Sequence, residues 1–196
     1  MDTQIKKVAV IAGPSGSGKN ALIDAILKVH PSCARLVTAT TRLPRPGETD
    51  SVDYHFFTEE QFKAAMATGA IPEHRYVEAL GTYYGIYLPD LEDKIKLNTT
   101  VFAQVDIVGA KLLKERYNAT TIFMMPASIV EFRGRLRSRN PEWSDQEFEE
   151  RMRITEEELR DHAPQYDYRV VNADGGLDRA VEEVIGILLR EGYTLD

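Results

Sequence analysis

A glycine-rich loop between a short apolar run and a helical pattern most constrains how this chain can fold. The loop reads GPSGSGK over residues 13–19, and a continuous apolar run over residues 8–12 precedes it. An apolar run of this length is typical of a strand buried on both faces of a parallel sheet. Apolar residues then recur at helical spacing over residues 21–27 and stop before His30-Pro31. Strand, loop and helix in this order predict a phosphate-binding loop.

The residue types of the loop suit a nucleoside triphosphate. Glycines let the backbone wrap a phosphate closely enough for its N–H groups to point inward. Lys19 places an ammonium beside the β- and γ-phosphates and is the expected catalytic cation, and the start of the following helix adds its positive end. The expected nucleotide-binding residues are Gly13, Pro14, Ser15, Gly16, Ser17, Gly18, Lys19, Asn20 and Ala21.

One position departs from the motif. Asn20 stands where a Ser or Thr hydroxyl ordinarily ligates Mg²⁺. An amide oxygen is also a hard donor, so we expect Asn20 to hold the metal directly or through a water. A loop that still binds phosphates but has lost efficient catalysis is the alternative at this position.

Composition and charge narrow the class of protein. The net charge of −7 and the pI near 5.2 argue against non-specific nucleic-acid binding, which needs clustered positive charge. The single cysteine, Cys33, and the lack of zinc-type Cys/His spacing in the sequence indicate a reducing compartment. The apolar run near the start is too short for a signal peptide or a membrane span. We therefore expect a cytoplasmic protein that binds neither nucleic acid nor membrane.

The rest of the chain predicts an α/β fold. Two further apolar runs, 100–105 and 121–125, are separated by a helical stretch at 109–117, and this alternation predicts a parallel sheet with right-handed crossovers. Residues 168–172 and 177–191 are predicted to form a last strand and a closing helix. At 196 residues, one sizeable core with a small appended lobe fits better than two independent domains.

Two segments interrupt this alternation. Residues 38–86 are rich in proline, polar and aromatic residues and predict a small mixed lobe inserted into the core, a common way to shape a substrate pocket. Residues 128–162 are helical and dense in charge, with Asn140-Pro141 between two predicted helices, so we expect a helical lid. The expected fold is thus a single three-layer P-loop domain whose core comprises residues 1–37, 87–127 and 163–196.

Three strings in the inserted lobe resemble the guanylate kinase family in residue type, order and spacing. They are TTRLPRPGE at 40–48, DYHF at 53–56 and GTYYG at 81–85. The resemblance implies transfer of phosphate from ATP, with Mg²⁺, to GMP or dGMP. It also implies that four residues grip the phosphate of the acceptor, and guanidinium forks and tyrosine hydroxyls suit that role. These residues are Arg42, Arg45, Tyr54 and Tyr84.

The positions that read the base in that family match only in part. Arg75 falls where the family has a glutamate, and a guanidinium cannot accept the N1–H and N2 protons of guanine. Glu73 or Glu78 can substitute if the loop is shifted. Ile86 falls where the family has a hydroxyl and removes that contact. Two positions keep the residue type of the family, and they are Thr38 and Asp106.

The resemblance also assigns arginines of the lid. Arg135 and Arg139 lie four apart on one helix face, and Arg151 follows the Asn140-Pro141 turn. By resemblance these three close over the ATP phosphates, where transfer depends on positioning and cationic stabilisation. An ordinary salt-bridged, exposed helix is the alternative for these arginines. Asn172, at the end of the last predicted strand, matches the position where the family approaches adenine.

Two other functions remain open from the sequence. One is a kinase of a different phosphorylated acceptor, such as another nucleoside monophosphate or ribose bisphosphate. Kinases of such phosphorylated sugars form a related P-loop group, in which a non-hydroxyl residue also occurs after the loop lysine. The DYHF and TTRLPR strings favour the nucleotide. The other is a non-catalytic guanylate-kinase-like binding module, although such modules usually lose the glycine loop. We expect a monomer or a homodimer with ATP and GMP as its small-molecule partners.

Overall fold

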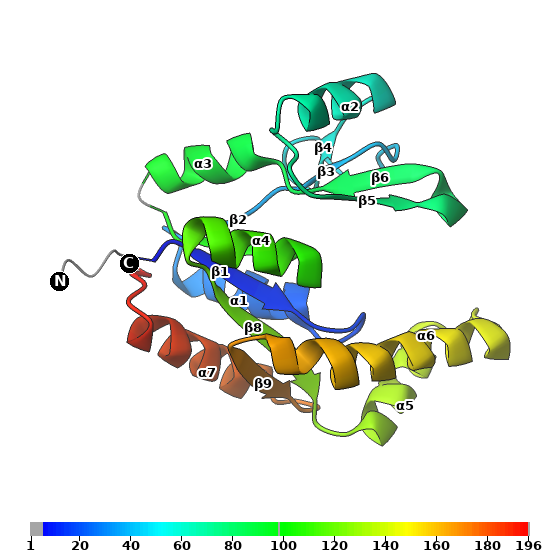
Figure 1. The fold of residues 1–196 in the computed structure, drawn as a ribbon. Coiled ribbons are helices and arrows are strands. Elements are labelled where there is room, and N and C mark those ends of the chain that lie inside the picture. Colours follow the sequence, from blue (N-terminus) through cyan, green and yellow to red (C-terminus); the bar gives the residue numbers. More distant parts are fainter. Residues whose placement is uncertain (1–5, 98, 196) are drawn as a thin grey trace.

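A parallel sheet forms the centre of the computed structural model, which describes residues 6–97 and 99–195 (Figure 1). Within these residues its strand order is β2-β7-β1-β8-β9, and every neighbouring pair is parallel. The predicted parallel sheet is therefore confirmed. The strands are β1 (Val8–Ala12), β2 (Ala34–Arg35), β7 (Val101–Ala103), β8 (Thr120–Pro126) and β9 (Tyr168–Asn172).

Helices cover both faces of this sheet and give three layers. The β1 side chains alternate between two apolar clusters, with Ala9 and Ile11 in one and Val8 and Val10 in the other, because successive strand residues point to opposite faces. The first cluster is closed by α1 and α7, and the second by α3 and α4. The helices are α1 (Lys19–Val29), α3 (Leu88–Lys96), α4 (Ile107–Tyr117) and α7 (Leu177–Arg190).

The end of β7 differs from the expected strand over residues 100–105. The strand stops at Ala103, and Asp106 caps the following helix, its carboxylate accepting hydrogen bonds from the N–H groups of Val108 (3.0 Å) and Gly109 (3.1 Å). This cap also starts α4 two residues before the expected position. Gln104 and Asp106 therefore lie in a turn at the carboxyl end of the strand.

The inserted segment forms a separate mixed sheet, as predicted. Its strand order is β4-β3-β6-β5, with β3 parallel to β4 and antiparallel to β6. Buried Phe62 of α2 packs with Ile71 and Ala39 in a small core of its own. The elements are β3 (Ala39–Thr40), β4 (His55–Phe56), α2 (Glu59–Ala67), β5 (His74–Val77), η1 (Glu78–Leu80) and β6 (Thr82–Gly85).

Two helices, α5 (Ile129–Arg139) and α6 (Asp145–Glu157), form the second appended unit. They share a small apolar cluster of Phe132, Leu136, Phe148 and Met152. Helix α6 continues into a π-helical turn, η2 (Glu158–His162), and a short 3₁₀ turn, η3 (Ala163–Gln165). Figure 1 shows both appended units beyond the carboxyl ends of the central strands, where parallel sheets bind ligands.

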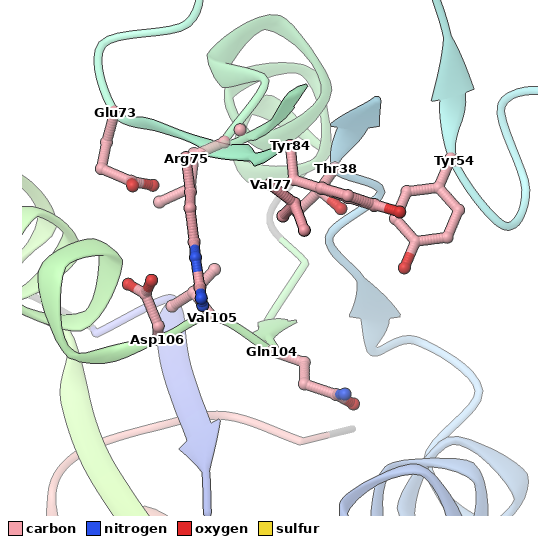
Figure 2. Close-up of a pocket in the computed structure, with 11 residues that line it drawn as sticks. Thr38, Tyr54, Glu73, Arg75, Val77, Tyr84, Gln104, Val105 and Asp106 are labelled. Carbon is pink, nitrogen blue, oxygen red and sulfur yellow. The ribbon is translucent and has the colours of Figure 1, made fainter. Parts of the chain in front are cut away.

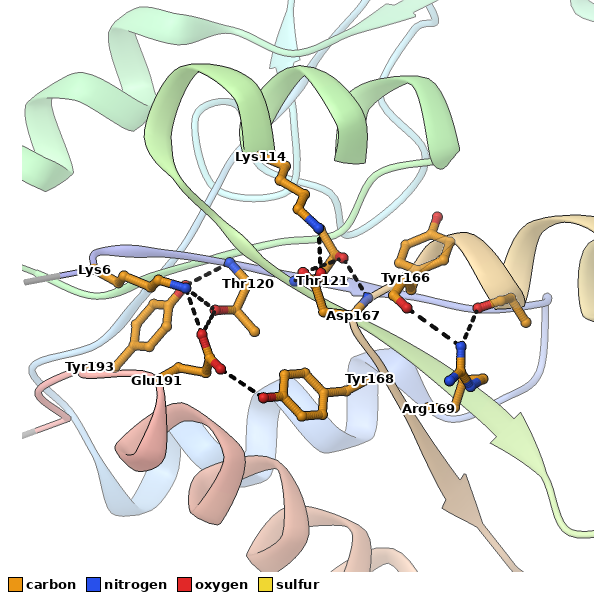
Figure 3. Close-up of polar contacts among 11 residues, drawn as sticks. Lys6, Lys114, Thr120, Thr121, Tyr166, Asp167, Tyr168, Arg169, Glu191 and Tyr193 are labelled. Atoms are coloured by element: carbon orange, nitrogen blue, oxygen red, sulfur yellow. Dashed lines mark hydrogen bonds and ion pairs between the residues drawn. The ribbon is translucent and has the colours of Figure 1, made fainter.

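Polar contacts at the opposite end of the sheet tie the last helix to the first strand (Figure 3). Glu191 accepts hydrogen bonds from the Lys6 ammonium (2.6 Å) and the Tyr168 hydroxyl (2.7 Å). The buried Tyr193 hydroxyl donates to the carbonyl of Val8 and accepts from the N–H of Thr120. These bonds fix the scaffold on which the site at the other end is built.

No helix among the described residues is long and apolar enough to cross a membrane.

Candidate active site

The glycine loop connects β1 to α1 in a conformation that favours glycine at three of its positions. Gly13, Gly16 and Gly18 have positive φ angles of 140°, 90° and 91°. A Cβ on Gly18 would lie 2.3 Å from Nδ2 of Asn172, and one on Gly13 would lie 2.7 Å from the carbonyl oxygen of Met124. The tight turn therefore follows directly from the glycine spacing.

The loop presents unused donors and a cation at its centre. Helix α1 begins at Lys19 without a side-chain cap, so its first N–H groups remain available to a ligand. The hydroxyl of Ser17 is buried and has no hydrogen-bond partner among the described residues. The Lys19 ammonium donates to the carbonyl oxygens of Gly13 (2.7 Å) and Pro14 (2.8 Å). This arrangement fits the phosphates of a nucleotide, which would supply the missing acceptors.

Burial sets the ionisation of Lys19. Desolvation lowers its pKa to about 8, and the nearby Glu158 carboxylate opposes part of that shift. Burial likewise raises the pKa of Glu158, the first residue of the π-helical turn, while Lys19 opposes it. A phosphate bound at the loop would favour the charged form of Lys19 further.

The three lid arginines occupy different environments. Arg139 lines a hollow of the glycine loop together with Lys19 and Asn20. Arg135 forms an ion pair with Asp174 (3.0 Å), and two of its buried guanidinium nitrogens have no hydrogen-bond partner in the part of the chain that the structure describes. Arg151 is exposed, with its guanidinium 5.5 Å from the ring centre of Trp143. The structure thus brings Arg139 to the loop and leaves Arg151 outside it.

Asn172 supports the loop in this structure. Its buried side-chain amide donates a hydrogen bond to the carbonyl of Ser17 (2.9 Å). The residue lies at the end of β9, as the sequence predicted. Its observed contact is with the loop backbone. The expected approach to adenine stays a prediction.

A hydrogen-bonded network within the mixed lobe contains Arg42, the first of the four residues predicted to bind the phosphate of the acceptor. The Arg42 guanidinium forms two 2.9 Å hydrogen bonds with the Glu48 carboxylate and lies 5.5 Å from the ring centre of Tyr54. The rings of Tyr54 and Tyr84 meet edge to face at 6.0 Å. Arg45 is exposed, and its backbone N–H donates to Glu48. Glu48 therefore orients Arg42 and the turn that carries Arg45 beside the two tyrosines.

A pocket of about 250 Å³ lies between the mixed lobe and the carboxyl end of β7 (Figure 2). Glu73 and Asp106 line it, one from each side of the gap, and Thr38 lines it as predicted. Ile86 contributes an apolar wall, and Arg75 also extends into the pocket. Glu73 therefore supplies a carboxylate to this pocket beside Asp106, and its reading of the base in place of Arg75 stays a prediction. Glu78 does not line this pocket and is exposed on η1.

The environment of the pocket changes the ionisation of Glu73. Desolvation raises the pKa of Glu73 to about 7, and the negative charge of Asp106 adds to the shift. Such a pair is well suited to a ligand edge that offers two adjacent hydrogen-bond donors, because each donor relieves the repulsion.

Comparison with known proteins decides the family. The model of the family described as Guanylate kinase matches residues 5–191. This chain belongs to the guanylate kinase family. The guanylate kinase of Thermosynechococcus vestitus is 38% identical over 86% of each chain, and that of Clostridium perfringens is 36% identical over 95% of this chain and 84% of its own. The crystal structure of guanylate kinase from Anaplasma phagocytophilum, 27% identical, superposes with a TM-score of 0.70 over 96% of this chain and 87% of that one.

Sequence reasoning missed two residues of this guanylate kinase site. Gln104 lines four hollows: the pocket of Glu73 and Asp106, one beside Asp24 and Asp53, one beside Glu158, and that of the glycine loop. Its position at the end of a strand next to β1 was the signal that could have found it. Glu158 was read as part of a charged helix, and its approach to Lys19 depends on a π-helical turn that the sequence pattern does not reveal.

Proposed function

We propose that this chain transfers the γ-phosphoryl group of ATP to GMP, forming ADP and GDP. The pairing of Glu73 and Asp106 in one pocket is the observation that carries the choice of acceptor. Guanine presents N1–H and N2–H side by side, and carboxylates accept both, whereas adenine has an acceptor at N1. Membership of the guanylate kinase family over nearly the whole chain supports the same reaction.

In this proposal the site divides into a donor side and an acceptor side. The loop amides and Lys19 bind the ATP phosphates, and Arg139 and Arg135 add positive charge from the lid. On the acceptor side, Glu73 and Asp106 bind guanine. Lys19 and the arginines stabilise charge that grows on the phosphoryl oxygens as the group moves. The residues proposed for the GMP phosphate are Arg42, Arg45, Tyr54 and Tyr84.

The described residues offer Mg²⁺ a weak protein site. They contain no cluster of three or more His, Cys, Asp or Glu side chains suited to a metal. Asn20 is exposed at the start of α1 and faces the loop hollow, where its amide oxygen fits a hard cation. We propose that Mg²⁺ enters with ATP, held mainly by phosphate oxygens, and supplies charge neutralisation between the phosphates when bound.

A panel of acceptors tests the proposed function. ADP formation from ATP and Mg²⁺ is measured with GMP, dGMP, AMP, CMP, UMP and ribose bisphosphate. We expect GMP and dGMP to give the highest kcat/KM. A preference for ribose bisphosphate or for another base would contradict the acceptor assignment, and no turnover with any member would favour a non-catalytic binding module.

The raised pKa of Glu73 predicts a pH dependence. Because its pKa is about 7, the neutral acid dominates below that pH. It keeps a carbonyl acceptor but carries an O–H donor, so it cannot accept from N1–H and N2–H with both oxygens as the carboxylate does. We expect the kcat/KM ratio of wild type to Glu73→Gln, with GMP, to rise about tenfold per pH unit up to pH 7 and then level off. The ionisation of GMP affects kcat/KM of wild type and variant equally, so its effect cancels in this ratio. A ratio that stays constant from pH 5.5 to 8.5 would show that Glu73 does not titrate against the base.

Asn20→Ser tests the metal assignment. A serine hydroxyl restores the usual ligand, so we expect the variant to reach half-maximal rate at a lower Mg²⁺ concentration and to match wild type at saturating Mg²⁺. Initial rates are measured in a Mg²⁺ titration at fixed ATP and GMP. An unchanged or weaker half-saturating concentration would mean that Asn20 is not a weakened metal ligand.

A further inference from the structure

Gln104 is the one described residue that lines all four of the hollows around the site. It follows β7 directly, and the register of β7 with β1 pairs Ala103 with Val10. Gln104 therefore lies beside the strand that leads into the glycine loop. From this position its side chain lies between the donor side, with Lys19 and Asn20, and the acceptor side, with Thr38.

The Gln104 carboxamide also has an unused acceptor. Its Oε1 atom is buried and has no hydrogen-bond partner among the described residues. Buried polar atoms in native proteins are nearly always satisfied, so an orphaned oxygen at the junction of two binding sites indicates a ligand or an ion. The carboxamide can accept through Oε1 and donate through Nε2 at the same time.

The chemistry of this position differs from that of P-loop enzymes in general. They hold Mg²⁺ with the loop hydroxyl and with an aspartate of the Walker B segment. Here the loop offers Asn20, and Gln104 directly follows the strand next to β1. Both carboxamides line the same hollow, and no carboxylate is among the described residues that line it.

We propose that Gln104 is a catalytic residue that contacts the phosphoryl group in transfer. This inference rests on the proposed function. Nε2–H donates to an oxygen of the moving group, and Oε1, together with the Asn20 amide oxygen on the same hollow, would help to hold the metal that enters with ATP. An oxygen of the GMP phosphate forms the new O–P bond while the bond from the γ-phosphorus to the bridging oxygen breaks, its electron pair leaving with ADP. The carboxamide exchanges no proton, and unlike a carboxylate it does not repel the incoming GMP phosphate.

Two variants of equal length separate these roles. Gln104→Met removes both the hydrogen-bond donor and the acceptor of the carboxamide. Gln104→Glu keeps the shape of the side chain, but its carboxylate accepts hydrogen bonds without donating any and adds a negative charge. Gln146→Glu, on an exposed position of α6, is the matched charge control. We measure kcat and KM for GMP, and separately the affinity for Mn²⁺ of the complex with the β,γ-imido analogue of ATP, by electron paramagnetic resonance.

We expect Gln104→Met to lower kcat by about 10²-fold and to weaken Mn²⁺ binding several-fold. Gln104→Glu is expected to bind Mn²⁺ about tenfold more tightly while kcat/KM for GMP falls at least about tenfold, because a carboxylate attracts the metal and repels the acceptor. Gln146→Glu should match wild type in each measurement. Thermal melting checks folding, and the isosteric Gln104→Glu variant keeps the test valid if Gln104→Met melts early.

Two results would overturn the inference. One is wild-type kcat and Mn²⁺ affinity in Gln104→Met, and the other is unchanged Mn²⁺ affinity in Gln104→Glu. A wild-type protein that does not phosphorylate GMP would instead contradict the proposed function. The two failures are therefore distinguishable.

Discussion

Replacement of Lys19 by alanine is expected to lower kcat for ATP and GMP by about 10³-fold. In this structure the Lys19 ammonium is held by the carbonyls of Gly13 and Pro14 at the centre of the glycine loop. That position places the cation where negative charge develops only as the phosphoryl group moves, so its loss affects the transition state more than ground-state binding. Steady-state kinetics with both substrates provide the measurement.

The fold should survive this substitution. Burial lowers the pKa of Lys19 to about 8, so at neutral pH its ammonium stays charged in the native protein although burial has removed part of its hydration. Alanine removes that cost, and we expect no loss in melting temperature. Between pH 8 and the ordinary lysine pKa of 10.5, the unfolded wild type binds more protons than the native state, so wild-type stability should gain with pH relative to Lys19→Ala.

Lys28→Ala is the matched control, because Lys28 is exposed near the end of the same helix. It removes the same charge without touching the loop and should keep wild-type kcat. Wild-type turnover in Lys19→Ala would show that the glycine loop is not the donor site. A lowered melting temperature with the lost activity would indicate a structural role instead.

The scaffold of the donor side could be predicted because local sequence determines it. The strand Val8–Ala12 has the predicted bounds, and the helix Lys19–Val29 contains the predicted periodic run 21–27 and ends before His30, as expected. Buried strand length, glycine spacing and helical periodicity each leave a direct signature in the sequence. The last strand, Tyr168–Asn172, agrees for the same reason.

The acceptor pocket was less predictable because it depends on register. Arg75 falls where the family has a glutamate, and β5 and β6 pair so that Arg75 lies opposite Tyr84. Glu73, which immediately precedes β5, lines the same pocket as Arg75. The loop between these strands has a short helical turn, Glu78–Leu80, that the sequence did not signal. Gln104 escaped notice because a lone glutamine carries no motif, and only the sheet order places it beside the loop.

The environment of Arg42 predicts the second large effect. Its guanidinium donates two hydrogen bonds to the Glu48 carboxylate and lies over the Tyr54 ring, so its direction is fixed before any ligand binds. Charge-assisted contacts of a guanidinium contribute roughly 1.5 to 3 kcal/mol each, and a fork can make two. We expect Arg42→Ala to lower kcat/KM for GMP by about 10²-fold and to change KM for ATP much less.

Arg42→Lys separates charge from geometry. It keeps the positive charge but loses the planar fork, so we expect it to recover only part of the lost kcat/KM for GMP. Arg179→Ala, on an exposed position of α7, is the control for removal of an arginine away from the lobe. Equal damage to the KM values of ATP and GMP in Arg42→Ala would contradict its assignment to the acceptor phosphate. In that case the Arg42–Glu48 pair would serve to hold the lobe together, and the phosphate of GMP would have to be held by other groups, with Arg45 and Tyr84 the next to be replaced.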